Sequence, residues 1–216
     1  MGACKKRGDL RLALALVILT VSALMPTPSG AQEAVLELDP ARTRIEFTLR
    51  GFPHSVHGTF TLTRGSIRVD SATGKADGLV IVDAASGNSG NHARDSEMNE
   101  GILETQRYPE IRFTPQQVEI QGVPQGEFRV KLRGLFWLHG TEHELTLDAQ
   151  VRLAGEVWTA TAHFVVPYVA WGLKDPSIFI LRVADRVEVD LTAAGRITWT
   201  PAAQTKSGGL HNVSGH

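Results

Sequence analysis

Residues 127–138 read EFRVKLRGLFWL, and residues 142–153, which follow after a short turn, read EHELTLDAQVRL. In both segments apolar side chains recur at alternate positions, the period that places successive residues on opposite faces of a strand. Each segment is 12 residues long, whereas a strand usually has about 5–6. Long alternating strands joined by short turns favour an antiparallel meander or an up-and-down barrel.

The same alternation continues in both directions along the chain. Nine such runs follow Gln32, and they cover residues 43–50, 56–62, 67–69, 77–84, 110–120, 127–138, 142–153, 157–166 and 187–197. The two runs beside Arg64-Gly65 are consistent with one strand bent at a glycine bulge, which would leave eight. About eight strands close into a barrel with room for one ligand. We therefore predict an all-β fold, an eight-stranded antiparallel barrel.

One short helix is expected after the fourth strand, over residues 96–104. Asp95 has the chemistry of an N-cap, because its carboxylate can accept bonds from the first free backbone N–H groups. Met98, Ile102 and Leu103 form an apolar stripe that would close one end of the barrel.

The first 31 residues have the features of a secretory signal peptide. A basic start is followed by 14 nearly uniformly apolar residues, and Ser29 and Ala31 place small residues before a cut at Gln32. The apolar run is shorter than the ~20 residues that span a bilayer. We expect cleavage near Ala31 and a periplasmic or secreted protein. Cys4 is the single cysteine, so the processed chain has no thiol for disulfide exchange or nucleophilic catalysis.

The expected organisation is a signal peptide over 1–31, one barrel domain over 32–199 and a disordered tail over 200–216. The whole chain has a formal net charge of −1, which becomes −4 once the basic signal peptide is removed. No basic patch stands out, so nucleic acid is not expected as a partner. The sequence leaves the oligomeric state open.

The alternation also divides each strand into an inner and an outer face. Small residues such as Ala149 and Ala162 alternate with bulky ones on the predicted inner faces. This pattern is consistent with an open cavity and equally with a filled, interdigitated core. The candidate ligand-binding residues on the inner faces are Phe47, Phe60, Ile81, Phe113, Phe128, Val130, Leu132, Phe136, Leu145, Leu147, Trp158, Ala160, Phe164, Val189 and Leu191.

An ordered set of short motifs resembles the YceI-like lipid/polyisoprenoid-binding family. The motifs are RIEFTL at 44–49, GSIRVD at 65–70, Arg94-Asp95 at the helix start, YPEIRF at 108–113 and VKLRG at 130–134. The resemblance covers residues 35–197. Met98-Asn99 differs from it, because family members often carry a histidine there.

The resemblance implies a lipocalin-like barrel that encloses an isoprenoid or fatty-acid-like chain. We therefore expect an exported, non-catalytic carrier or scavenger that needs no cofactor, with envelope proteins as possible partners through the loop at Trp171. Burial of each CH₂ contributes about 0.8 kcal/mol, so a long apolar chain can bind without covalent chemistry. Head-group or rim contacts are predicted for Arg94, Asp95, Met98 and Trp171, with a cation near the mouth suited to a phosphate or carboxylate.

A histidine-based metal site is the alternative. His54 and His57 precede a strand, His92 precedes the helix, and His139 and His143 flank a turn that would bring them together. Imidazole binds zinc well, but histidines at turns and barrel rims are also ordinary polar residues. The sequence has no Gly-x-Ser-x-Gly elbow and no phosphate-binding glycine loop. We therefore predict that the protein is not an enzyme.

Overall fold

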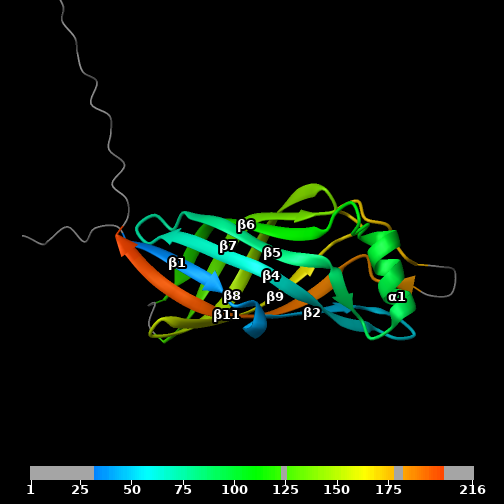
Figure 1. The fold of residues 1–216 in the computed structure, drawn as a ribbon, viewed down its shortest axis with the longest axis horizontal. Coiled ribbons are helices and arrows are strands. Elements are labelled where there is room, and N and C mark those ends of the chain that lie inside the picture. Colours follow the sequence, from blue (N-terminus) through cyan, green and yellow to red (C-terminus); the bar gives the residue numbers. More distant parts are fainter. Residues whose placement is uncertain (1–31, 123–125, 178–181, 202–216) are drawn as a thin grey trace, which may run out of the picture. The chain divides into compact units, whose positions relative to one another are not determined.

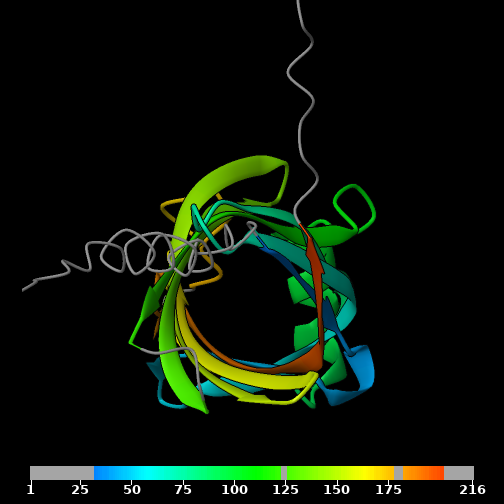
Figure 2. The same cartoon turned by 90° about the vertical axis from the view of Figure 1, so that its left-hand side faces the viewer.

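A nine-stranded antiparallel sheet forms the wall of a closed barrel (Figure 1). The computed structural model describes residues 32–122, 126–177 and 182–201. The wall strands are β1 (Gln32–Leu38), β2 (Arg44–Leu49), β4 (Val56–Asp70), β5 (Ala76–Asn88), β6 (Glu110–Gln121), β7 (Glu127–Leu138), β8 (Thr141–Ala154), β9 (Val157–Val166) and β11 (Val187–Pro201). Pairing of β11 with β9 closes the sheet, and Figure 2 shows the strands surrounding one axis.

The nine strands occupy eight positions around the barrel, as predicted. β1 and β2 both pair with β4 on one side and β11 on the other, so they lie end to end at one position. The short 3-10 helix η1 (Pro40–Arg42) separates them, and the Asp39 carboxylate accepts a 3.0 Å bond from the backbone N–H of Ala41. The two runs beside Arg64-Gly65 are one strand, β4, with register shifts against β5 at 59–61 and 62–64.

The first strand, β1, was missing from the predicted set. Its Ala34, Leu36 and Leu38 alternate with polar neighbours, but the segment is only seven residues long and follows the predicted signal peptide directly. At the other end of the chain β11 runs to Pro201, two residues into the predicted tail. The predicted signal peptide and residues 202–216 lie outside the described residues.

The predicted helix begins earlier than expected and has a different cap. α1 (His92–Glu97) continues into a π-helical turn, η2 (Met98–Ile102). The side chain of Asn91, not of Asp95, caps α1 by accepting a 3.1 Å bond from the backbone N–H of Arg94. Asp95 lies inside the helix, so the prediction that it is the N-cap is wrong. None of the helices in the described part of the chain is long and apolar enough to cross a bilayer.

A second, two-stranded sheet lies outside the barrel wall. Gly51–Phe52 (β3) pairs with Arg182–Val183 (β10), with Arg182 opposite Phe52 and Val183 opposite Gly51. A side chain at Gly51 would lie 2.9 Å from the His54 carbonyl oxygen. A glycine is therefore needed for the tight path from β3 into β4.

Two clusters of buried apolar side chains lie toward opposite ends of the barrel. The first cluster contains Leu138, Val166, Tyr168, Leu173 and Val189. The second cluster contains Ala34, Trp158, Ala193 and Ile197. The first cluster packs against the helical segment through Ile102 and Leu103, as the predicted apolar stripe requires.

Trp171 lies at the edge of the first cluster and stacks on His143. The two rings are nearly parallel, at 2°, with centroids 4.2 Å apart. The Nε2 atom of His143 is buried without a hydrogen-bond partner. Burial lowers the pKa of His143 below its ordinary value of 6.5, because the charged imidazolium loses hydration.

Gly195→Ala is expected to destabilise the barrel by about 1–3 kcal/mol, the range for forced overpacking. Gly195 lies where β11 passes β1, and a methyl group there would collide with the Glu37 carbonyl oxygen and lie 3.0 Å from the Trp158 ring. Urea unfolding followed by tryptophan fluorescence measures the loss. The neighbouring, exposed Arg196→Ala should change stability by no more than about 0.5 kcal/mol, and equal effects would contradict the steric explanation.

His143→Phe is expected to reduce the acid sensitivity of the fold. The unfolded chain protonates this histidine below about pH 6.5, whereas the folded protein resists protonation. Stability from this residue is therefore full above that pH and is lost as the pH falls toward the lower folded pKa. Phenylalanine keeps an aromatic ring on Trp171 and cannot titrate. The urea midpoint, measured between pH 7.5 and 5, should therefore fall less steeply with falling pH in the variant than in the wild type. An equally steep fall would contradict a contribution of His143 to the acid sensitivity.

Candidate functional site

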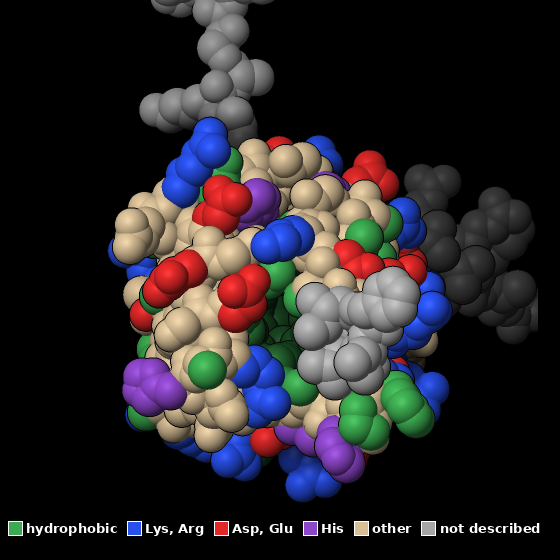
Figure 3. All heavy atoms as spheres, turned by 90° about the vertical axis from the view of Figure 1, so that its right-hand side faces the viewer, with side chains coloured by type: hydrophobic (Ala, Val, Ile, Leu, Met, Phe, Trp, Pro, Cys, Tyr) green, Lys and Arg blue, Asp and Glu red, His purple; other side chains and the backbone are tan. Residues whose placement is uncertain are grey.

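The barrel encloses a cavity of about 860 Å³, and every wall strand contributes to its lining. Ligand pockets usually have volumes of about 300–1,000 Å³. Figure 3 shows the hollow at the α1 end, with apolar side chains inside it and both acidic and basic side chains around it. The interior is therefore an open cavity. The alternating pattern was equally consistent with a filled, interdigitated core, which the structure does not have.

Small side chains opposite one another leave this space open. Ala149 on β8 pairs with Ala162 on β9, and Val151 pairs with Ala160 in the same ladder. All four residues line the cavity. Since neighbouring positions hold Leu147 and Phe164, replacing these alanines by residues of similar bulk would occupy part of the volume.

The lining of the cavity is almost entirely apolar. Polar side chains reach its lining at a few positions, which are Thr43, His54, Ser55, Ser71, Ser89, Arg94 and Glu97. Two lining aromatics direct their polar atoms away, to backbone carbonyl oxygens. Trp158 Nε1 donates to Arg196 at 3.1 Å, and the Tyr168 hydroxyl donates to Ala184 at 2.8 Å. Burial and the nearby Asp175 and Asp185 raise the pKa of Tyr168 to about 12, so the hydroxyl stays neutral.

All of the predicted ligand-binding residues except Ile81 line the cavity. Val80 and Val82 line it instead, and Ile81 is buried on the other side of β5 with only 2% of its surface exposed. Leu79 to Val82 is a continuous apolar run, so the sequence carries no alternation there to show which residues face inward. Ile81 was therefore assigned to the wrong face.

The predicted rim residues divide into two pairs. Arg94 and Met98 line the cavity, whereas Asp95 and Trp171 do not. Arg94 donates from Nε to the Ser89 hydroxyl at 2.8 Å and from Nη2 to the Ser89 carbonyl at 3.0 Å. The Asp95 carboxylate accepts bonds from the Ser89 hydroxyl and backbone N–H, which lower the pKa of Asp95. Both charged residues thus hold the loop before α1 in place.

The five histidines of the alternative metal site make different contacts. His54 lines the cavity, His57 bonds Thr48 at 2.9 Å, and His92 begins α1. His139 packs on Tyr108, with ring centroids 4.5 Å apart, while His143 stacks on Trp171. Within residues 32–122, 126–177 and 182–201, no three His, Cys, Asp or Glu side chains lie close enough to hold a metal ion.

Several lining residues were not among the predicted site residues. Ala34, Leu36 and Leu38 come from the unpredicted β1, and their short alternation was the available signal. Phe52 and Pro53 line the cavity from outside the wall strands. They follow an irregular path that periodicity does not describe.

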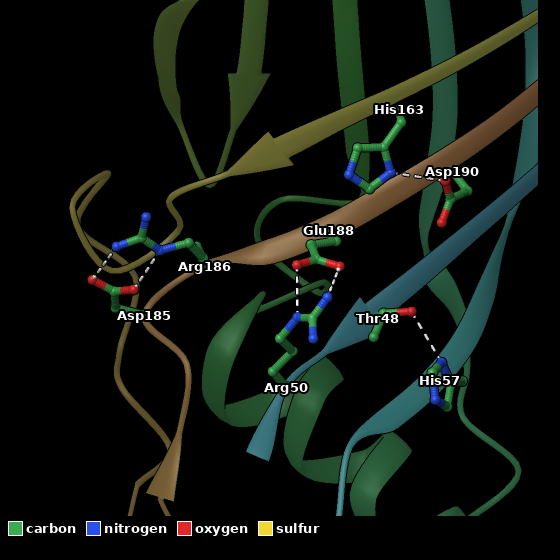
Figure 4. A network of polar contacts seen from close by, with 8 residues as sticks. All are labelled: Thr48, Arg50, His57, His163, Asp185, Arg186, Glu188 and Asp190. Atoms are coloured by element: carbon green, nitrogen blue, oxygen red, sulfur yellow. Dashed lines mark hydrogen bonds and ion pairs between the residues drawn. The ribbon is translucent and has the colours of Figure 1, made fainter.

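The outer face of the same strands is polar (Figure 4). Along β2 and β11 the inward Phe47 and Val189 alternate with outward residues that form ion pairs and hydrogen bonds. Arg50 donates two bonds to Glu188, at 2.7 and 3.0 Å, and this guanidinium lowers the pKa of the Glu188 carboxyl. The other contacts of this outer face are Thr48 with His57, His163 with Asp190 and Asp185 with Arg186. The charges thus lie outside the barrel and leave the interior apolar.

The fold is similar to that of solved structures from Burkholderia cenocepacia, Saccharophagus degradans and Campylobacter jejuni. BcnA of Burkholderia cenocepacia is 15% identical, with a TM-score of 0.59 over 73% of this chain and 99% of that one. A polyisoprenoid binding domain from Saccharophagus degradans implicated in plant cell wall breakdown is 17% identical, with a TM-score of 0.56 over 78% and 99%. The Campylobacter jejuni YceI protein is 16% identical, with a TM-score of 0.51 over 61% and 79%. At these identities the likeness concerns the fold.

Comparison at the level of sequence gives a more specific result. No curated protein matches the chain significantly. The sequence profile of the YceI-like domain, however, matches residues 36–194, from within β1 to within β11. The match covers most of the closed wall, and on this basis the chain belongs to the YceI-like family.

Proposed function

We propose that the protein is an exported, non-catalytic carrier or scavenger that holds one long apolar lipid inside the barrel. The observation that carries this proposal is the apolar cavity of about 860 Å³. A polyisoprenoid or a fatty-acyl chain matches its chemistry, because such chains offer many CH₂ and CH₃ groups and few hydrogen-bonding atoms. The likeness to a domain described as polyisoprenoid binding supports the same class of ligand.

Burial of hydrocarbon supplies enough binding energy for this role. Each CH₂ transferred from water contributes about 0.8 kcal/mol, so about ten methylenes contribute roughly 8 kcal/mol. That free energy corresponds to a dissociation constant near 1 μM before the entropy of ordering the chain is subtracted. Longer chains that fill more of the cavity bind more tightly. Affinity should therefore follow chain length more than head-group chemistry.

A bulky residue placed inside the cavity is expected to displace the lipid. Ala162 lines the cavity, whereas Thr161, the next residue on β9, is exposed on the outside. Ala162→Trp should weaken lipid binding at least about tenfold, because lost burial of two methylenes already corresponds to that factor in the dissociation constant, and it should lower the amount of co-purified lipid. Organic extraction of the purified protein followed by mass spectrometry measures the bound lipid.

Thr161→Trp is the matched control, since it adds the same side chain to the opposite face of the same strand. It should retain wild-type lipid. Ala149→Phe, at the position paired with Ala162, provides a second filling variant should Ala162→Trp fail to fold by circular dichroism. The carrier proposal fails if the wild-type protein releases no lipid and binds no prenyl or acyl probe.

Export is expected to remove the first 31 residues. When the full chain is produced in a bacterium with an outer membrane, the intact mass should correspond to a protein that begins at Gln32. Fractionation should recover this protein from the periplasm or the medium. A protein of full-length mass in the cytoplasm would contradict the export part of the proposal.

A further inference from the structure

Phe52 is the most exposed of the large apolar residues in the described part of the chain, with 75% of its surface accessible. The others with large exposure are Trp199 at 51%, Ile120 at 49% and Val165 at 40%. Isolated exposed apolar residues are common on soluble proteins. Phe52, Ile120 and Trp199 also line the cavity, whereas Val165 does not, and Phe52 is the most exposed of the three and is followed by Pro53, another lining residue. Phe52 therefore presents apolar surface both to the cavity and to the outside.

The backbone holds Phe52 in this exposed position. Phe52 lies in β3, which is paired with β10, and the Ala184 N–H donates to the Arg50 carbonyl at 2.7 Å beside that pair. Gly51 leaves no room for a side chain against the His54 carbonyl. The aromatic ring is thus presented on a short, hydrogen-bonded projection. We name residues Phe52 and Pro53 the mouth tip.

The charges around the mouth tip suit the surface of a bilayer. Arg182, which is exposed, lies directly opposite Phe52 in the β3–β10 pair. An aromatic ring beside an arginine is the combination that places apolar surface among acyl chains and a cation at the phosphates. The neighbouring Arg50 is paired with Glu188, and Arg186 with Asp185. Each of these two pairs is neutral overall and therefore adds no net charge beside the mouth tip.

We propose that the mouth tip inserts into the surface of a phospholipid bilayer and thereby places the cavity mouth against the lipid that the protein loads or releases. The proposal rests on the proposed function, since a bilayer contact at the mouth serves a protein that holds a lipid. Direct contact removes a step in which a long apolar chain would cross water, which is unfavourable by about 0.8 kcal/mol for each exposed CH₂. The inserted surface is small, so binding is expected to be reversible.

Co-sedimentation with phosphatidylcholine vesicles tests the insertion. The processed chain, residues 32–216, should sediment with the vesicles, and Phe52→Ser should lower its partition coefficient at least about tenfold, the effect of removing one buried aromatic. Val165→Ser is the matched control, because Val165 is exposed on the outside of β9 and does not line the cavity. This control should sediment as the wild type does. Binding that depends on apolar insertion should also change little between 50 and 500 mM salt.

Two further measurements separate this proposal from the carrier function. Loading with a long-chain prenol from detergent, measured by mass spectrometry, should be retained in Phe52→Ser, while loading from vesicles becomes several-fold slower. If the wild type takes up no prenol from detergent and none from vesicles, the carrier function itself is overturned. If the wild type binds prenol but partitions onto vesicles no better than Phe52→Ser, only the proposed membrane insertion of the mouth tip is overturned. If Trp199→Ser lowers vesicle partition more than Phe52→Ser does, the insertion of the mouth tip is also overturned, because the membrane contact would then belong to Trp199.

Discussion

Pairing between β9 and β11 is the contact on which the rest of the structure depends. The register runs from Val187 opposite Val166 to Arg196 opposite Val157 and turns an open sheet into a closed wall. Closure satisfies both sheet edges, and it also assigns each alternate side chain to the inside or the outside. The apolar cavity follows from that assignment, because eight strand positions enclose more space than the small side chains of β8 and β9 fill.

The two faces of the wall have opposite chemistry for the same reason. Outward residues on and beside these strands form contacts such as the Arg50–Glu188 ion pair and the His163–Asp190 hydrogen bond. These contacts are exposed and contribute little to stability individually. Their importance lies in keeping charge off the inner face, where an unpaired ion would be strongly unfavourable. A ligand inside the barrel therefore contacts hydrocarbon over most of its length and meets polar groups such as Arg94 and Glu97 only at a few points.

Alternation was a reliable guide where it was long and regular, and it failed where the sequence did not alternate. Phe128, Leu147 and Phe164 lie on strongly periodic strands, and each lines the cavity as predicted. Ile81 lies in a run of consecutive apolar residues, which fits either face. A helix was predicted in this part of the chain, but it begins at His92, earlier than expected, and its cap is a different residue. Asn91 and Asp95 have similar capping chemistry, and the choice between them depends on where Ser89 lies in the folded loop.

The sequence by itself determined that the chain forms long antiparallel strands and which residues of the regular strands share a face. These properties follow from local geometry, since a period of two is set by the backbone of a single strand. Only the tertiary structure decided that the inner faces enclose a cavity and that Phe52 is exposed beside its mouth. Cavity volume depends on the distance across the barrel between strands far apart in sequence, and no local pattern encodes that distance.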